Sequence, residues 1–162
     1  MPATDAIGKP IPPQTVVLER GPASNFARAV KDENPIYRDP RAAQAAGFES
    51  IPIAPTYSFA WHHWGEFAEQ QPDGAGGQHP MVDAMGELLA NGGLILHGGQ
   101  EFVYHRQPLV GDVLTSRGSV KDVYEKTSSS GKTMTFIITE TQWIDADGEP
   151  VVTSTMTLLH RA

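Results

Sequence analysis

Apolar positions recur in two rhythms along the chain, and the change of rhythm divides it into two parts. In the first part, apolar residues spaced three and four apart favour helices. From Leu94 onward the sequence is rich in β-branched residues, and turn residues break it into four segments. A short β-branched run at 15–19 predicts one further strand. We therefore expect four long strands, at 94–106, 113–124, 132–144 and 151–159.

Two short helices are expected before these strands. Ser24 or Asn25 can cap a helix that runs to Val30, because their side chains accept hydrogen bonds from free backbone amides. Asp39 followed by Pro40 predicts the start of a second helix, which a glycine at position 47 ends.

The strongest helical pattern covers 56–67. Its apolar residues form one broad stripe, namely Tyr57, Ala60, Trp61, Trp64, Phe67 and Ala68. The width of this stripe predicts a long helix that is buried on most sides. Residues 70–80 are rich in Gln, Gly and Pro and predict an exposed loop, and residues 85–90 predict a short helix that ends at Asn91.

This order of elements predicts an α+β protein with a single hotdog fold, in which one antiparallel sheet wraps around one long apolar helix. A chain of 162 residues is expected to form one domain, spanning 1–162. The sheet leaves unpaired edges, so we expect the protein to dimerise.

Charge and composition narrow the function. With 12 Lys and Arg against 19 Asp and Glu, the net charge of −7 argues against nucleic acid and anionic membranes as main partners. The absence of cysteine excludes disulfides, thiolate chemistry and Cys-bound zinc. The start has no apolar signal region and no run approaches about 18 apolar residues, so we expect a cytoplasmic protein.

The most informative motif is Asp32-Glu33-Asn34-Pro35-Ile36-Tyr37. With the flanking residues 26–55, it resembles the signature region of the MaoC-like hydratases and dehydratases, which add or remove water across the α,β-bond of acyl thioesters. The stretches 96–102 and 108–112 are similar to the same family. Catalytic members carry His two residues after the proline, where this chain has tyrosine. The chain is most similar to the subunit of actinobacterial (3R)-hydroxyacyl-ACP dehydratases that binds the acyl group, while a second hotdog subunit supplies the Asp and His.

The reaction needs a base and an acid on either side of one carbon pair, and histidine suits this work because it titrates near neutrality. Tyrosine is a poor base at neutral pH, since its ordinary pKa is about 10. The resemblance gives Asp32, Tyr37 and His97 as candidate catalytic residues. Charge on the thioester oxygen needs backbone N–H donors, for which we expect the helix N-terminus at Thr56 and Tyr57.

The candidate substrate-binding residues come from the motif, the helix and the later glycines; they are Asn34, Pro55, Thr56, Tyr57, Trp61, Gly98 and Gly99. Three of the candidate residues also have a plain structural interpretation: Asn34 can form a local turn, Trp61 can belong to the core, and His97 can be an ordinary strand residue. Adjacent histidines at 62 and 63 would point apart on a helix. We expect no metal and no cofactor.

These observations predict a subunit of a 3-hydroxyacyl-thioester dehydratase or enoyl-thioester hydratase. The substrate is expected to be an acyl thioester of CoA or acyl carrier protein, and the partner a second copy or a catalytic MaoC-like subunit. In one variant a homodimer is active through Asp32 with His97 or Tyr37. Two alternatives stay open: a non-enzymatic module that binds acyl-CoA or acyl-ACP, and a hotdog thioesterase, for which Glu66 and Glu69 lie too late in the expected helix.

Overall fold

Six strands form one antiparallel sheet in the computed structural model, which describes residues 3–129 and 131–161. The outermost residues of the expected 1–162 domain, and Ser130 in the loop between the second and third long strands, lie outside the described residues. The strands are β1 (Pro10–Ile11), β2 (Thr15–Val17), β3 (Leu94–Tyr104), β4 (Val113–Thr127), β5 (Thr133–Ile144) and β6 (Pro150–Arg161).

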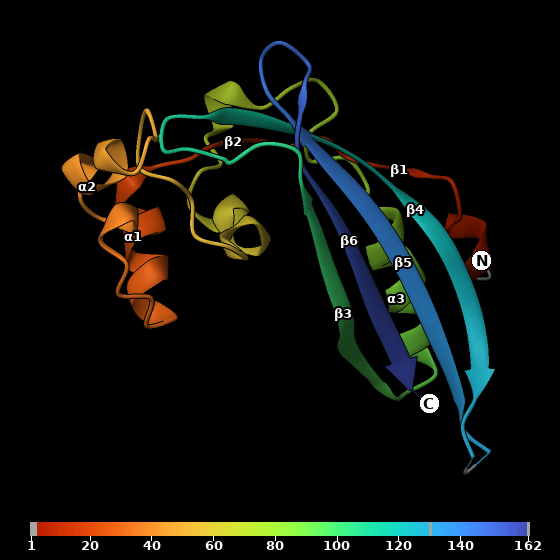
Figure 1. Cartoon of the computed structure of the whole chain (residues 1–162). Helices are drawn as coiled ribbons and strands as arrows, with labels where there is room; N and C mark the ends of the chain where they lie inside the picture. The colour runs from red at the N-terminus through yellow and green to blue at the C-terminus, as the bar shows by residue number, and fades with distance from the viewer. Residues whose placement is uncertain (1–2, 130, 162) are drawn as a thin grey trace.

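The sheet order is β1-β4-β5-β6-β3, with β2 also paired to β4. Figure 1 shows the four long strands running side by side and bending strongly along their length. The prediction of four long antiparallel strands is confirmed. β3 is the last strand of the order, so one of its edges has no strand beside it in the described chain.

Helix α3 (Pro80–Ala90) lies against one face of the sheet (Figure 1). Met81 and Ala84 are buried there in an apolar cluster with Val120, Val123 and Ile137. α3 begins with proline at its first position, and the His79 Nδ1 atom accepts a hydrogen bond from the backbone N–H of Met81 (3.3 Å). At Pro80–Ala90, α3 is longer than the helix expected at 85–90, and it begins at the end of the loop expected at 70–80.

The long helix expected at 56–67 is absent, which corrects the sequence prediction. The chain forms two 3₁₀ turns instead, η3 (Tyr57–Phe59) and η4 (Trp61–His63), and a third, η5 (Ala68–Gln70), follows. Thr56 adopts a left-handed backbone (φ 68°) that starts no α-helix. Gly65 lies flush against β2, where the backbone N–H of Val17 donates to its carbonyl (2.8 Å).

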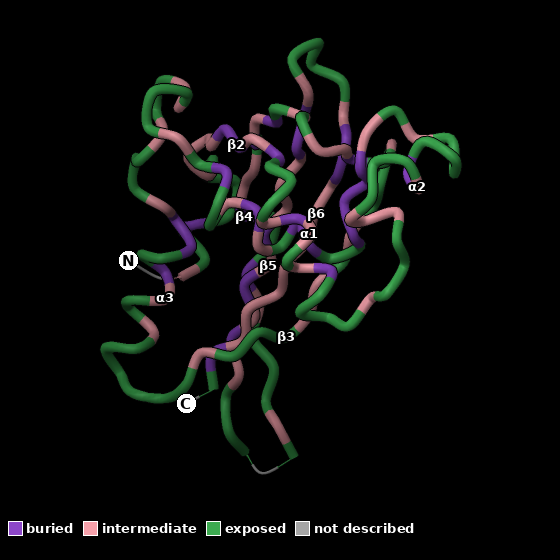
Figure 2. Tube along the Cα trace, turned by 90° about the vertical axis from the view of Figure 1, so that its left-hand side faces the viewer, coloured by how far each residue is buried: buried purple, intermediate pink, exposed green. Residues whose placement is uncertain are grey.

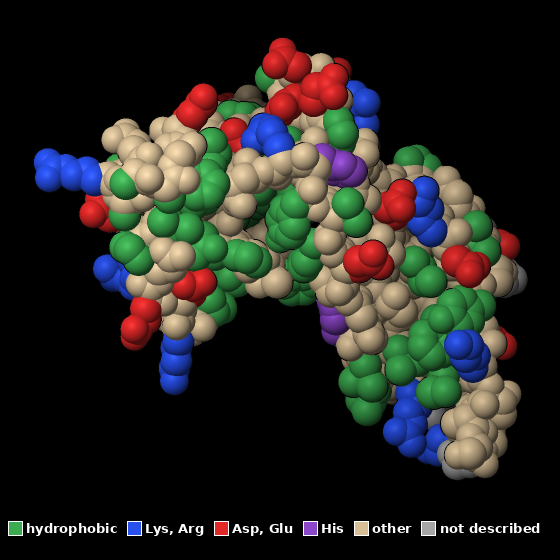
Figure 3. All heavy atoms as spheres, viewed as in Figure 1, with side chains coloured by type: hydrophobic (Ala, Val, Ile, Leu, Met, Phe, Trp, Pro, Cys, Tyr) green, Lys and Arg blue, Asp and Glu red, His purple; other side chains and the backbone are tan. Residues whose placement is uncertain are grey.

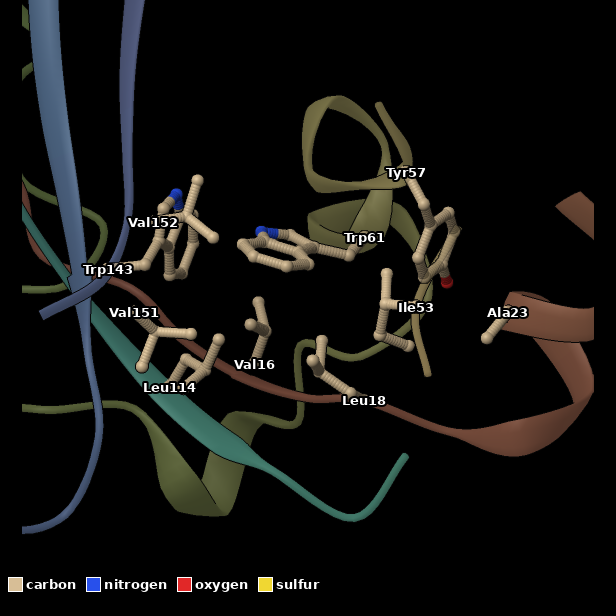
Figure 4. Close-up of a cluster of buried hydrophobic side chains, with 10 residues drawn as sticks. All are labelled: Val16, Leu18, Ala23, Ile53, Tyr57, Trp61, Leu114, Trp143, Val151 and Val152. Carbon is tan, nitrogen blue, oxygen red and sulfur yellow. The ribbon is translucent and has the colours of Figure 1, made fainter. Parts of the chain in front are cut away.

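These turns form one wall of the second apolar cluster, which lies at the end of the sheet (Figure 4). Trp61 is completely buried, and its ring meets the edge of Trp143 at 5.2 Å between centroids. Figure 4 shows Trp61 pointing toward Trp143 and Val152, with Tyr57 and Ile53 on its other side. The apolar spacing of 56–67 thus predicts the burial of Tyr57 and Trp61 correctly, but Trp64 is 54% exposed and the backbone is not helical.

An arm extends from the sheet between β2 and residue 50. It consists of α1 (Arg20–Ala29), η2 (Pro35–Tyr37) and α2 (Pro40–Ala45). Figure 2 shows that much of the arm is exposed, while buried stretches recur along the strands. The prediction of Asp39 as N-cap and Pro40 as first residue of α2 is confirmed, since Asp39 Oδ1 accepts from the Arg41 N–H (2.9 Å).

The start of α1 differs from the prediction. The helix begins at Arg20 with Glu19 as its N-cap, and neither Ser24 nor Asn25 caps it. The Ser24 hydroxyl instead donates to the backbone carbonyl of Tyr37 (2.9 Å), which ties α1 to η2. The sequence did not predict that residues 20–23 are helical, because Gly21 and Pro22 have low helix propensity.

Candidate functional site

The Asp32–Tyr37 segment is a compact turn held by its own side chains. Asp32 Oδ1 accepts a hydrogen bond from the Asn34 N–H (3.0 Å), and Asn34 Oδ1 accepts one from the Ile36 N–H (3.2 Å). Asn34 is thereby the N-cap of η2. This is the local role that short polar side chains before proline commonly have. The turn places Asp32 close to Tyr37, whose side chain is partly buried.

The electrostatics of this turn keep Tyr37 protonated. Burial raises the pKa of the Tyr37 phenol above its ordinary value, and the negative charge of Asp32 raises it further. A phenol with a raised pKa donates hydrogen bonds at neutral pH but accepts no proton as a base. Tyr37 therefore keeps its proton at neutral pH and can act there as a hydrogen-bond donor.

A basic cavity of about 270 Å³ lies beside the same turn. Arg20, Arg28 and Arg38 line it together with Ser24 and Asn25. Arg20 reaches across and donates to the backbone carbonyl of Arg38 (3.1 Å). Three guanidinium groups around one open cavity favour a phosphate or carboxylate ligand.

The segment 54–58 lies between the arm and the sheet, and the backbone N–H groups of Thr56 and Tyr57 already have acceptors. The Thr56 N–H donates to the hydroxyl of Tyr104 (3.1 Å), and the Tyr57 N–H donates to the carbonyl of Ala54 (3.2 Å). The expectation that the N-terminus of a long helix at Thr56 and Tyr57 offers free donors for a thioester oxygen is therefore wrong. Pro55 and Thr56 are exposed beside this turn.

Tyr57 and Phe59 connect the arm to the sheet. The Tyr57 ring packs against Phe26 of α1 (5.1 Å between centroids), and burial together with the charge of Glu19 raises its pKa to about 12. The Phe59 ring meets His97 of β3 edge-on at 5.3 Å. Trp61, the other aromatic candidate, belongs to the core and presents no surface in this conformation.

His97 lies at a β-bulge in β3. The register shifts between His97 and Gly99, so His97 pairs with Leu158 of β6 and Gly99 pairs with Thr157. Cross-strand partners share a face, so His97 lies on the same face of the sheet as Leu158. A side chain at Gly98 would meet the carbonyl oxygen of Thr157 at 3.3 Å. The glycine therefore allows close approach of a neighbouring strand.

The structure thus divides the sequence-predicted residues between three places. The turn holds Asp32, Asn34 and Tyr37. The segment 55–61 holds four more, and the bulge of β3 holds His97, Gly98 and Gly99. In the described part of the chain, no hydrogen bond or ring contact joins Asp32 or Tyr37 to His97.

The His62 and His63 rings are 3.9 Å apart, contrary to the expectation for a helix, but no group of three potential metal ligands occurs among the described residues.

A second cavity, which the sequence did not reveal, lies on the covered face of the sheet. Its volume is about 300 Å³, and strands β3 to β6 contribute to it together with η3, η4 and the start of α3. The available signal is the polar side chains of Thr139 and Thr141 in β5 and of Ser154 in β6, at positions where an antiparallel sheet normally buries apolar side chains.

Comparison with known proteins places the chain in a family. The family described as "FAS1-like, dehydratase domain region" matches residues 5–154, and the chain belongs to this family. A UPF0336 protein of Leifsonia xyli is 32% identical over 152 residues, covering 94% of this chain and 89% of that protein. A probable enoyl-CoA hydratase alpha subunit of Thermomonospora curvata is 32% identical over 139 residues, covering 83% of this chain and 42% of that protein.

Solved structures agree with this assignment. The ChsH1–ChsH2 complex of Mycobacterium tuberculosis matches with a TM-score of 0.73 and 25% identity, over 97% of this chain and 85% of that chain. The truncated HadBC (3R-hydroxyacyl-ACP dehydratase) complex of the same organism matches with a TM-score of 0.69 and 23% identity, over 97% of this chain and 98% of that chain. The prediction of a MaoC-like hotdog protein is therefore confirmed. None of its described helices is long and apolar enough to cross a membrane.

Proposed function

We propose that this chain is the acyl-binding subunit of a 3-hydroxyacyl-thioester dehydratase or enoyl-thioester hydratase, and that a MaoC-like partner supplies the catalytic Asp and His. The observation that carries the proposal is Tyr37. It stands two residues after Pro35, where the resemblance implies a histidine in catalytic members, and its raised pKa keeps it protonated at neutral pH and so unsuited to act as a base. Asp32 is engaged in a local turn, and no hydrogen bond or ion pair joins it to a histidine among the described residues.

The free edge of β3 supports the partner. Leu94, Leu96 and Val103 expose 63%, 44% and 48% of their surface along this strand. An unpaired strand edge with apolar side chains normally pairs with another chain or is shielded from doing so. Figure 3 shows the molecule hollowed between the arm and the lower end of the sheet, with hydrophobic side chains gathered above the hollow. A second hotdog subunit at this edge would cover both features.

The basic cavity supports the thioester class. Both CoA and the phosphopantetheine arm of a carrier protein carry phosphate at the far end of the pantetheine arm from the acyl thioester, and guanidinium groups bind phosphate through paired, charge-assisted hydrogen bonds. The cavity formed by Arg20, Arg28 and Arg38 lies directly beside the turn of Asp32 and Tyr37. It would hold a phosphate while the acyl group enters between the arm and the sheet.

Complex formation tests the proposal. The chain is co-expressed with a MaoC-like chain that keeps Asp-x-Asn-Pro-x-His, and the complex is measured by native mass spectrometry. We expect a heteromer that Leu96→Lys with Val103→Lys disrupts, because lysine at a strand edge opposes pairing. Val82→Lys on α3 is the matched control, since Val82 is exposed to 54% and lies away from the edge. A folded chain that forms no heteromer, or a heteromer insensitive to the double variant but lost in Val82→Lys, would contradict the proposal.

A further inference from the structure

A belt of polar side chains crosses the covered face of the sheet between its two apolar clusters. Ser116 of β4, Thr139 and Thr141 of β5, and Ser154 of β6 line the 300 Å³ cavity with Gln100 of β3. Thr141 pairs with Ser154 on one side and on the other with Gly118, which lies two positions from Ser116 on β4. Trp143 borders it toward one cluster and Met156 toward the other. Burial alone would favour apolar residues at all of these positions.

Gln100 presents an unused acceptor in this belt. Its Nε2 atom donates to Ser154 Oγ (2.6 Å) and to the backbone carbonyl of Thr155 (3.2 Å). Because a carbonyl oxygen only accepts, the amide nitrogen must face Thr155, and this fixes the orientation of the side chain. Gln100 Oε1 is then buried and receives no hydrogen bond from the described chain. A buried acceptor without a donor is costly, so a bound group with an O–H or N–H is expected to meet it.

The cavity carries no Asp, Glu, Lys or Arg among its lining residues. Its two histidines, His62 and His79, both have a pKa below the ordinary value because burial disfavours their charged form. They are neutral at physiological pH. The cavity therefore suits a neutral ligand, and its volume lies at the lower end of the range for small-molecule sites.

We propose that this cavity binds an acyl chain that carries a neutral oxygen function, with a hydroxyl of the chain donating to Gln100 Oε1. The inference rests on the proposed function, since it specifies the acyl group of that thioester. An unsubstituted alkyl chain would offer no donor to Gln100 Oε1 and no polar partner to the hydroxyls that line the cavity. A hydroxylated chain supplies that donor, so the site favours it.

The test compares decanoyl-CoA with isomers hydroxylated at successive carbons of the distal half, by calorimetry with the purified protein or its complex. We expect the best hydroxylated isomer to bind roughly tenfold more tightly than decanoyl-CoA. Gln100→Met should abolish this preference. Thr139→Val, which removes one hydroxyl and keeps the side-chain shape, should reduce it. Thr135→Val is the matched control, because Thr135 is equally buried on the same face of β5 and does not line the cavity.

The outcomes separate the two proposals. Equal binding of plain and hydroxylated chains would show that the cavity holds only water, and would overturn this inference while leaving the acyl-binding role intact. A preference that survives both Gln100→Met and Thr139→Val would also overturn it. Binding of neither thioester would contradict the proposed function itself, and the inference with it.

Discussion

The arm and the covered face of the sheet are built from opposite chemistries. The arm carries charge: five of the twelve Lys and Arg residues lie within residues 20–41, and they are Arg20, Arg28, Lys31, Arg38 and Arg41. The sheet face carries apolar clusters and, between them, a cavity without a single charged side chain. An acyl thioester has the same division, with phosphates at one end and an uncharged chain at the other. The two regions therefore match the two ends of the proposed ligand.

The arm and the sheet face also differ in the sequence separation of the contacts that stabilise them. The turn of Asp32 and Asn34 is formed by hydrogen bonds between residues two positions apart. The sheet face depends on contacts between residues far apart in sequence, such as Trp61 with Trp143. Changes in the sheet should therefore affect the stability of the whole domain, whereas changes in the arm should affect binding first.

Truncation of Trp61 should have the largest effect on stability. Trp61→Ala removes a fully buried ring from the centre of the apolar cluster, and large-to-small changes of this kind cost about 3–5 kcal/mol. Urea denaturation followed by circular dichroism measures the loss. Trp61→Phe should cost much less, because the Trp61 Nε1 atom has no hydrogen-bond partner in the described chain to lose. A loss below about 1 kcal/mol for Trp61→Ala would mean that the cluster is not the core.

Gly118→Ala should have the next largest effect. The added methyl group would lie 2.8 Å from Thr141 Oγ1 and 2.9 Å from the carbonyl oxygen of Glu140, so β4 and β5 would have to separate. Such overpacking costs about 1–3 kcal/mol. The control is Gly86→Ala on α3, where no atom lies within 4 Å of the new methyl. Alanine in a helix should stabilise by about 0.5–1 kcal/mol, and equal costs at both glycines would contradict the packing of the sheet.

Arg28→Ala tests whether the basic cavity of the arm binds the phosphate of an acyl thioester. Loss of one charge-assisted hydrogen bond to phosphate should weaken the binding of an acyl-CoA roughly tenfold, with little change in the urea midpoint. The acyl thioester of N-acetylcysteamine has no phosphate, and its binding should be unchanged. Arg117→Ala on β4 is the matched control, since Arg117 is exposed and does not line the basic cavity. Equal weakening for both thioesters would indicate a different role for Arg28.

Acidification should produce the smallest effect. The pKa values of His62 and His79 are lowered in the folded protein by burial, so the unfolded chain binds more protons below its ordinary histidine pKa of about 6.5. Stability that is present above this pH should therefore fall as the pH drops through the folded pKa values. The double variant His62→Gln with His79→Asn should flatten this part of the profile. An unchanged slope between the two proteins would show that these histidines do not contribute.

The sequence predicted what depends on local pattern. Alternation and turn residues gave the four long strands, and Asp39 with Pro40 gave the start of α2. The segment 56–67 misled because its apolar spacing fits a helix and also fits successive 3₁₀ turns anchored by Tyr57 and Trp61. The choice between a helix and these turns depends on the hydrogen bond between Gly65 and Val17 of β2. These residues lie about 50 positions apart in sequence, so a local apolar pattern carries no information about their contact.

The candidate site was predictable to the same extent. The turn of Asp32, Asn34 and Tyr37 follows from its motif. The polar cavity does not, because its lining comes from residues as distant as Ile11 and Met156. Gln100 lies within a stretch that the family resemblance had marked, but its unused acceptor becomes visible only once Ser154 and Thr155 are placed beside it.

Hydration of a trans-2-enoyl-CoA by the purified, folded chain tests the central claim most directly. The loss of enoyl absorbance is followed with the chain alone and with a MaoC-like partner that keeps Asp-x-Asn-Pro-x-His. We predict no turnover by the chain alone and turnover by the pair, unaffected when Asp32→Asn is introduced into this chain. Turnover by the chain alone that Asp32→Asn abolishes would contradict the claim and would make this chain a catalytic hydratase in its own right.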